Sequence, residues 1–459
     1  MSILRKILNW HRYNIQLLPK IVSFDFNAVE IKSCYRYITR MPAPTSIVPQ
    51  AHNVNTDSPS NSKVQSVSGA RVNIEGYNFP ASQAVSLTSN MKHEILIIPA
   101  STVPSFGSVF NIDIKEKNIL FHNLTLQFVT GAVVGTNLVG TFNPCWYFFT
   151  RLELVQNGTV IDTGYGNQQF IQNQWLDWDE DRLSVNNAAG NYSNATQRLG
   201  LSSQTTSNTF YANLKTYFDQ TKLALLSDNH NIQLRITMDT LQNAFNVTSG
   251  TLISCPFQSC SAICKITRMD QGSVQSRCED MRVYGNHSIF HELKAGFYPI
   301  SAGITTASVI MNSVAGNIAC LMFTVRSTVA GSIPWNFLPI TSFALLDSGG
   351  SNIVGGQSLP AAFALNLLNK DFCKSSYNTE TGYGSNNQGA NVFCWSFSAD
   401  MISALSHGQA LSSRKMTGQE QLVITFPTAL ATSVQVDVYA YSECLLDMSL
   451  SSVKKMSFA

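Results

Sequence analysis

Charged residues are scarce in this chain. They make up 13% of its 459 residues, against roughly 25% in a typical soluble domain. Much of the polar surface must therefore consist of Asn, Ser, Thr, Gln and Gly. Removing an amide or a hydroxyl from water costs far less free energy than removing an ion. The composition therefore suits a protein whose surface is largely covered by neighbouring molecules, and the alternative is a secreted β protein of low charge.

The sequence also lacks long hydrophobic runs. The longest, such as Ile318 to Val325, have the length of a strand and are far short of a membrane-spanning helix. After Arg5-Lys6 the apolar residues are interrupted by polar ones, so we expect no secretory signal. The ten cysteines form no dense short-range framework, which is typical of reduced, buried thiols. We expect a soluble protein made inside a cell.

Motifs of enzymatic chemistry are missing too. There is no phosphate-binding glycine loop, no Gly-x-Ser-x-Gly and no His-Glu-x-x-His. Three weaker patterns have two readings each. Four cysteines could bind zinc or be buried strand residues: Cys255, Cys260, Cys264 and Cys278. Two histidines beside a glutamate, His287, His291 and Glu292, could bind a metal or lie in turns and strand ends. The acidic run from Asp177 to Asp181 could bind calcium or end a helix. We predict no catalytic, cofactor-binding or metal-binding residues.

The charge that is present is unevenly distributed. Residues 1–40 carry seven basic and two acidic side chains, a net charge of +5, and the remainder of the chain has a net charge of −3. A basic tail on a nearly neutral body indicates an anionic partner, either nucleic acid or a membrane surface. The alternative is a solvated terminus. The candidate contact residues are Arg5, Lys6, Arg12 and Lys20.

Strand signals dominate beyond a Pro- and Ser-rich stretch at residues 41–65. Segments such as 94–98, 109–114 and 124–129 are short, rich in β-branched and aromatic residues, and bounded by Pro, Gly or Asn. Helical spacing is evident at residues 167–178, where Phe170, Ile171, Gln174 and Trp175 recur every three to four positions. This pattern predicts a β-sandwich or barrel with short helices.

A predicted hairpin at residues 150–164 has a second copy later in the chain. In the first copy Asn157-Gly158 supplies the two positive-φ residues of a type I′ turn, and the second, at residues 341–356, turns near Ser348-Gly349-Gly350, 191 residues later. Three further segments repeat in the same order. They are the helix and its equivalent at 359–369, the strand at 233–237 with its equivalent at 421–425, and the strand at 124–128 with its equivalent at 321–325. Matching Asn/Ser/Gly-rich loops follow at 184–208 and 375–391. An ordered set of this kind predicts two tandem copies of one β domain.

This duplicated pattern resembles the double jelly-roll major capsid proteins of DNA viruses. The segment at residues 152–162 is similar to a hairpin in the first jelly roll of that family, and residues 421–426 and 434–441 resemble its closing strands. The hairpin differs from the Ile-Gly-Gly-Gln type usual in the large viruses, which favours a smaller or divergent lineage. The resemblance implies an all-β fold of two tandem eight-stranded jelly rolls with short helices, long loops and an extended N-terminal arm.

What the resemblance implies for function is a structural role in a virion. Members of the family form pseudo-hexagonal homotrimeric capsomers that tile an icosahedral shell around DNA, together with penton and minor capsid proteins. We predict an arm and linker at residues 1–75, a first jelly roll at 76–275 and a second at 276–459. The arm would meet an internal membrane, packaged DNA or neighbouring subunits. Two alternatives are a tandem jelly-roll hydrolase acting on glycans and a carbohydrate-binding spike protein.

Overall fold

The computed structural model divides the chain into two compact units, residues 1–65 and Ser66–Ala459. The described residues all belong to the second unit. They are residues 71–74, 77–80, 92–117, 119–175, 188–190, 200–201, 207–216, 231–268, 272, 275, 286–329, 332–355, 357–366, 391–398, 413–448 and 453–457. The predicted basic arm, the acidic run at 177–181 and most of the two Asn/Ser/Gly-rich loops lie outside these ranges. Among the described residues no helix is long and apolar enough to cross a membrane.

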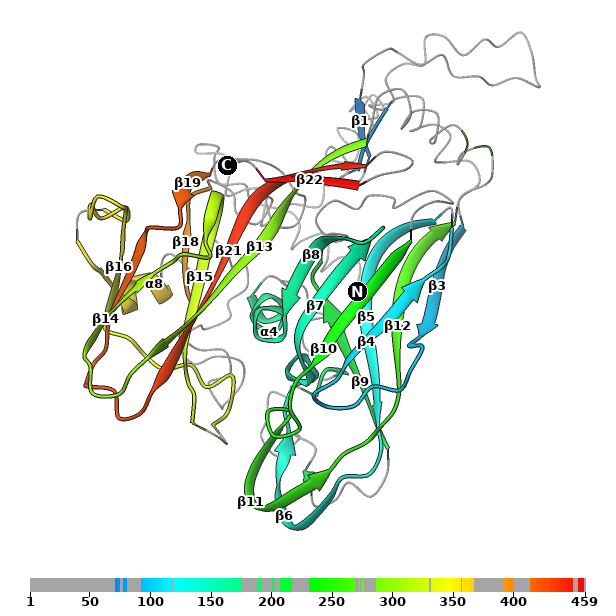
Figure 1. Ribbon diagram of the computed structural model, residues 1–459, viewed down its shortest axis with the longest axis horizontal. Coiled ribbons are helices and arrows are strands. Elements are labelled where there is room, and N and C mark those ends of the chain that lie inside the picture. Colours follow the sequence, from blue (N-terminus) through cyan, green and yellow to red (C-terminus); the bar gives the residue numbers. More distant parts are fainter. Residues whose placement is uncertain are drawn as a thin grey trace, which may run out of the picture. The chain divides into compact units, whose positions relative to one another are not determined.

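Two four-stranded antiparallel sheets form the first half of the described chain (Figure 1). The first has the order β4-β10-β7-β8, with β4 Val109–Ile114, β10 Ile232–Met238, β7 Phe149–Gln156 and β8 Thr159–Tyr165. The second has the order β3-β12-β5-β9, with β3 Lys92–Pro99, β12 Phe257–Arg268, β5 Ile119–Thr130 and β9 Asn208–Leu214. Along β10 every second side chain is buried, as expected for a strand with one face toward a core.

The second half repeats this arrangement. One sheet has the order β14-β20-β16-β17, with β14 Thr306–Ile310, β20 Gln421–Thr425, β16 Ser342–Leu346 and β17 Leu359–Pro360. The other has the central order β13-β21-β15-β18, with β13 Asn286–Ile300, β21 Val434–Met448, β15 Ala315–Ser327 and β18 Phe393–Ser396. Each half thus has eight strands in the same chain order and sheet order, which is the arrangement of two jelly rolls.

The remaining elements are attached to these two frameworks. A two-stranded ribbon pairs β6 (Val134–Phe142) with β11 (Phe245–Ser254), and β1 (Arg71–Ile74) pairs with β2 (Tyr77–Pro80). In the second jelly roll β19 (Arg414–Thr417) pairs with β15, and β22 (Val453–Ser457) pairs with β21. The helices include the 3-10 helix η1 (Cys145–Phe148), α4 (Gly166–Trp175) after β8, and α8 (Ala361–Asn366) after β17.

The predicted repeat is confirmed strand by strand. The segments at 124–128 and 321–325 lie in β5 and β15, those at 233–237 and 421–425 form β10 and β20, and a helix follows the hairpin in both copies. The type I′ turn is confirmed, because Asn157 and Gly158 have φ values of 48° and 81°. The second turn differs in that Gly350 alone takes a positive φ, 82°, while Asp347 accepts hydrogen bonds from the backbone N–H groups of Gly349 and Ser351.

Two hydrophobic clusters fill the fold. One belongs to the second jelly roll alone and is built on residues such as Leu321, Phe323 and Val438. The other fills the first jelly roll and continues onto the second, where it includes Tyr439 and Tyr441 of β21. One face of β21 therefore packs into the core of its own sandwich, and the opposite face is covered by the first jelly roll. The chosen domain boundaries at 75/76 and 275/276 stay predictions.

Candidate functional site

Helix α4 lies where the two jelly rolls meet. It begins at Gly166, where a Cβ atom would come within 2.2 Å of the Trp146 carbonyl oxygen, so that only glycine fits. Its apolar side carries Phe170, whose ring lies 6.1 Å from the ring of Trp146 and 5.3 Å from that of Tyr147. Packing of this side on η1 leaves Asn167, Gln168 and Gln172 facing the second jelly roll.

Three amides of α4 bind polar groups of β21. Asn167 Nδ2 donates to Asp437 Oδ2 at 3.1 Å and to the Tyr439 hydroxyl at 3.2 Å. Gln168 and Gln172 both donate through Nε2 to the Tyr441 hydroxyl, at 3.3 and 2.5 Å. We call this set the seam; it consists of Asn167, Gln168, Gln172, Asp437, Tyr439 and Tyr441. Because buried polar groups must be paired, the seam allows only a narrow range of positions for one sheet against the other.

An ion pair adds charge to the seam. Arg326 of β15 donates through Nε to Asp437 Oδ2 at 2.7 Å, and the Asp437 side chain is only 1% exposed. Burial raises the pKa of Asp437, and the nearby Arg326 charge opposes that rise. Burial likewise holds the pKa values of Tyr439 and Tyr441 well above their usual range, so both hydroxyls remain protonated. A pair of this kind is weak evidence for net stability, but removing one partner leaves an uncompensated buried charge.

Aromatic side chains complete the contact between the jelly rolls. The ring of Tyr165, at the end of β8, lies 5.1 Å from that of Phe297 on β13 and 6.4 Å from that of Tyr439. Tyr147 of η1 lies 5.5 Å from Trp335 of the second jelly roll. The outer face of the β13-β21-β15-β18 sheet is therefore covered by α4, η1 and the end of β8.

The corresponding face of the first jelly roll has no such cover among the described residues. On β3, Ile95 is 74% and Ile97 is 59% exposed, and Ile263 of β12 pairs with Ile97 in the sheet. At one end of this face the Thr267 hydroxyl hydrogen-bonds the rings of both His93 and His122. Exposed branched aliphatic residues grouped on one sheet are typical of an interaction surface.

The cysteines considered for zinc are buried in the first jelly roll. Burial raises the pKa of Cys255 to about 11 and those of Cys260 and Cys264 to about 12, so these thiols stay protonated at neutral pH. Zinc binding needs the thiolate form. Cys278 lies outside the described residues. Within the described ranges no three His, Cys, Asp or Glu side chains come together as a metal site.

The histidines considered for metal binding lie on a strand. Both His287 and His291 belong to β13, His287 next to its first residue and His291 within it, where it is buried. Glu292 faces two lysines and bonds Lys294 at 2.9 Å and also Lys455 of β22. Burial raises the pKa of Glu292, but hydrogen bonds and charge from the two lysines outweigh it and lower the pKa below its usual value. The group is an ion-pair cluster that ties β22 to the sheet.

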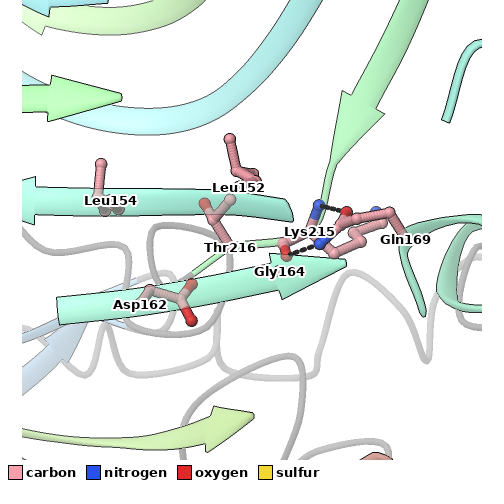
Figure 2. A pocket seen from close by; sticks show the side chains of 7 residues that line it. All are labelled: Leu152, Leu154, Asp162, Gly164, Gln169, Lys215 and Thr216. Carbon is pink, nitrogen blue, oxygen red and sulfur yellow. Dashed lines mark hydrogen bonds between the residues drawn. The ribbon is translucent and has the colours of Figure 1, made fainter. Parts of the chain in front are cut away.

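A small cavity lies inside the first jelly roll between β7, β8 and the segment after β9. Figure 2 shows Gln169 exchanging two hydrogen bonds with the backbone of Lys215, at 2.8 and 2.7 Å, beside Gly164 and Asp162. The cavity volume of about 10 Å³ is at the lower limit for one water molecule. The arrangement holds α4 on its own jelly roll and offers no room for a substrate.

The fold is similar to that of several solved structures. PBCV-1 VP54, as fitted into a reconstruction of the virophage Sputnik, matches with a TM-score of 0.57 and 15% identity over 80% of this chain and 97% of VP54. The Faustovirus major capsid protein matches with a TM-score of 0.57 and 9% identity, over 81% of this chain and 91% of its own. The chain has the double jelly-roll fold of viral major capsid proteins. No protein-family profile and no curated protein matches the sequence.

The predicted capsid-protein fold is therefore confirmed, while the predicted lineage stays a prediction at these low identities. The seam was not foreseen from the sequence, although the repeat carried a missed signal for the sheet face on which it lies. His93-Glu94-Ile95 and His291-Glu292-Leu293 are equivalent triplets 198 residues apart, and both lie in the first strand of their jelly roll, β3 and β13. Their alignment identifies the two equivalent sheet faces.

Proposed function

We propose that this chain is a major capsid protein whose homotrimers form pseudo-hexagonal capsomers of an icosahedral shell around a DNA genome. The observation that carries the proposal is the duplicated eight-stranded topology, which covers nearly all of VP54 and matches the PBCV-1 virus capsid chain with a TM-score of 0.56 at 14% identity. Three chains with two equivalent jelly rolls each supply six similar modules, which is the number a pseudo-hexagon needs. No observation favours a hydrolase or a spike protein.

The proposal includes partners and a location. The chain would lie in the virion shell, made in the host cell interior and joined there by penton and minor capsid proteins. The basic residues Arg5, Lys6, Arg12 and Lys20 would contact an internal membrane or packaged DNA, because opposite charge attracts them to phosphate. The domain limits we propose are 1–75 for the arm, 76–275 for the first jelly roll and 276–459 for the second.

Mass and microscopy of the purified chain test the proposal. We expect light scattering to give about three times the 50.4 kDa of one chain, and negative-stain images to contain hexagonal particles or shells. A stable monomer at micromolar concentration would contradict the proposal. Residues 41–459 alone should keep the trimer but assemble shells poorly. Complete shells from this shortened chain would contradict only the role proposed for the arm.

A further inference from the structure

Strand register gives an exact equivalence between the two outer sheet faces. Met322 of β15 pairs with Tyr439 of β21, and Tyr439 pairs with Ala295 of β13. The equivalent row in the first jelly roll runs from Thr125 of β5 to Ile263 of β12 and Ile97 of β3. Two residues along, Leu293 of β13 corresponds to Ile95 of β3.

Burial differs sharply between these equivalent positions. Leu293 is 7% exposed, whereas Ile95 is 74% exposed. Tyr439 is fully buried, whereas Ile263 is only partly buried. The difference arises because α4 and β8 of the first jelly roll cover the second, and no described element covers the first. We call Ile95, Ile97 and Ile263 the bare face.

Burial of the two helices differs in the opposite sense, because the outward side of α4 is buried and that of α8 is exposed. Counting from the equivalent strands β8 and β17, Phe170 of α4 corresponds to Leu365 of α8, and both are buried in their own jelly rolls. Gln168, which binds β21, corresponds to Phe363, and these residues are 2% and 42% exposed. Asn167 corresponds to Ala362, which is exposed as well.

We infer that the exposed side of α8, Ala362 and Phe363, packs on the bare face of a second copy of this chain. The inference rests on the proposed function, since the partner is another subunit of the same capsomer. The contact within the chain supplies the template. There α4 packs on the β13-β21-β15-β18 sheet, and between two copies α8 would pack on the β3-β12-β5-β9 sheet in the same way. The chemistry of the two sides agrees in each case, because amides of α4 meet tyrosines and apolar residues of α8 would meet isoleucines.

Such a contact joins two different surfaces, so each copy offers one helix and one bare face. A head-to-tail contact of this kind either closes into a ring or continues as a filament. Repeating the internal geometry between chains alternates the two jelly rolls around one axis, which favours a closed ring. The bare face is then buried in the assembly, which removes the exposed isoleucines from water.

Disulfide trapping between two differently tagged chains tests the contact. One chain carries Ile97→Cys and the other Phe363→Cys, and the two are co-expressed and oxidised. We expect a disulfide-linked heterodimer on a non-reducing gel from the mixture and none from either variant alone. The control replaces Ile97→Cys by Val109→Cys, which is exposed on the other sheet of the same jelly roll and should give no link. The seven free cysteines among the described residues are buried and should not compete.

A charge placed on either surface of the proposed contact should prevent the contact from forming. Ile97→Asp and Phe363→Asp should each reduce the mass to that of one folded chain, and Val109→Asp should leave the mass unchanged. A native trimer that gives no heterodimer, and that survives both substitutions, would overturn this contact while leaving the proposed function standing. A monomeric native chain would overturn both.

Discussion

The two jelly rolls have the same strand order but differ in the polarity and burial of the side chains on their outer sheet faces. On β21 the face toward the first jelly roll carries Asp437, Tyr439 and Tyr441, all buried and hydrogen-bonded. On β3 the equivalent face carries Ile95 and Ile97, both exposed. The same backbone can therefore present a polar seam within a chain or an apolar surface toward another molecule. The chemistry of the covered face matches that of α4, whose amides bind its buried polar groups.

The largest expected effect comes from removing the ion pair on the covered face. Arg326→Met leaves Asp437 buried without its charge partner, which typically costs about 3–5 kcal/mol of unfolding free energy. The control is Arg235→Met, since Arg235 bonds Glu153 at 3.3 Å on a more exposed surface, where such pairs contribute about 0–1 kcal/mol. Urea unfolding followed by tryptophan fluorescence measures both. Equal losses in the two variants would contradict the role given to the seam.

The same variant should respond to pH in a defined direction. Burial raises the pKa of Asp437 even with Arg326 present, and removal of Arg326 takes away the charge that opposes this rise. A group whose folded-state pKa is raised favours the folded state at low pH, and this contribution is lost as the pH rises through that pKa. The loss in Arg326→Met should therefore be smaller at pH 4.5 than at pH 7.5. A loss that grows on acidification would mean that Asp437 is not the group left unpaired.

A smaller effect is expected from a matched pair of Gln-to-Tyr hydrogen bonds. Gln172 donates to the buried Tyr441 on the covered face, and Gln127 of β5 donates to the exposed Tyr211 of β9 at 3.1 Å, on the β3-β12-β5-β9 sheet but outside the bare face. Gln172→Ala removes the shorter of the two amide hydrogen bonds to the buried Tyr441 hydroxyl and should cost about 1–3 kcal/mol. Gln127→Ala should stay within about 0.5 kcal/mol, as is usual at a surface. Urea unfolding midpoints compare the two, and a larger loss from Gln127→Ala would contradict the assignment of the first hydrogen bond to a buried contact and the second to an exposed surface.

Local patterns explain how much of the fold could be predicted from the sequence. The hairpin followed from Asn157-Gly158 and the alternation around it, and α4 followed from the spacing of Phe170 and Ile171, because both signals span only a few residues. Repetition of these signals then predicted two tandem copies of one β domain, and the resemblance to capsid proteins implied that each copy is a jelly roll. The turns differ in detail because Asp347 uses its carboxylate where the first copy uses Asn157 in a left-handed conformation.

The seam could not be predicted because its partners are far apart in the chain. Asn167 and Asp437 are 270 residues apart, and Gln172 and Tyr441 are 269 apart. Amides on a short helix are typical of a face toward water, so nothing local identifies them as buried. The ribbon of β6 and β11 was missed for a related reason: most positions of β6 are exposed and lack the apolar alternation that marks a strand with one buried face.

The smallest expected effects compare the two hairpin turns. Gly158 and Gly350 have φ values of 81° and 82°, and a Cβ atom at either would meet nothing within 4 Å. Gly158→Ala and Gly350→Ala should each cost about 1 kcal/mol, from the backbone conformation alone. Gly349 has no positive φ, and its added Cβ would meet only the Asp347 carboxylate at 3.3 Å, so Gly349→Ala should be nearly neutral. If Gly349→Ala cost as much as Gly350→Ala, the second turn would use both glycines, as the first uses Asn157 and Gly158, and the two hairpins would be alike in turn chemistry as well as in register.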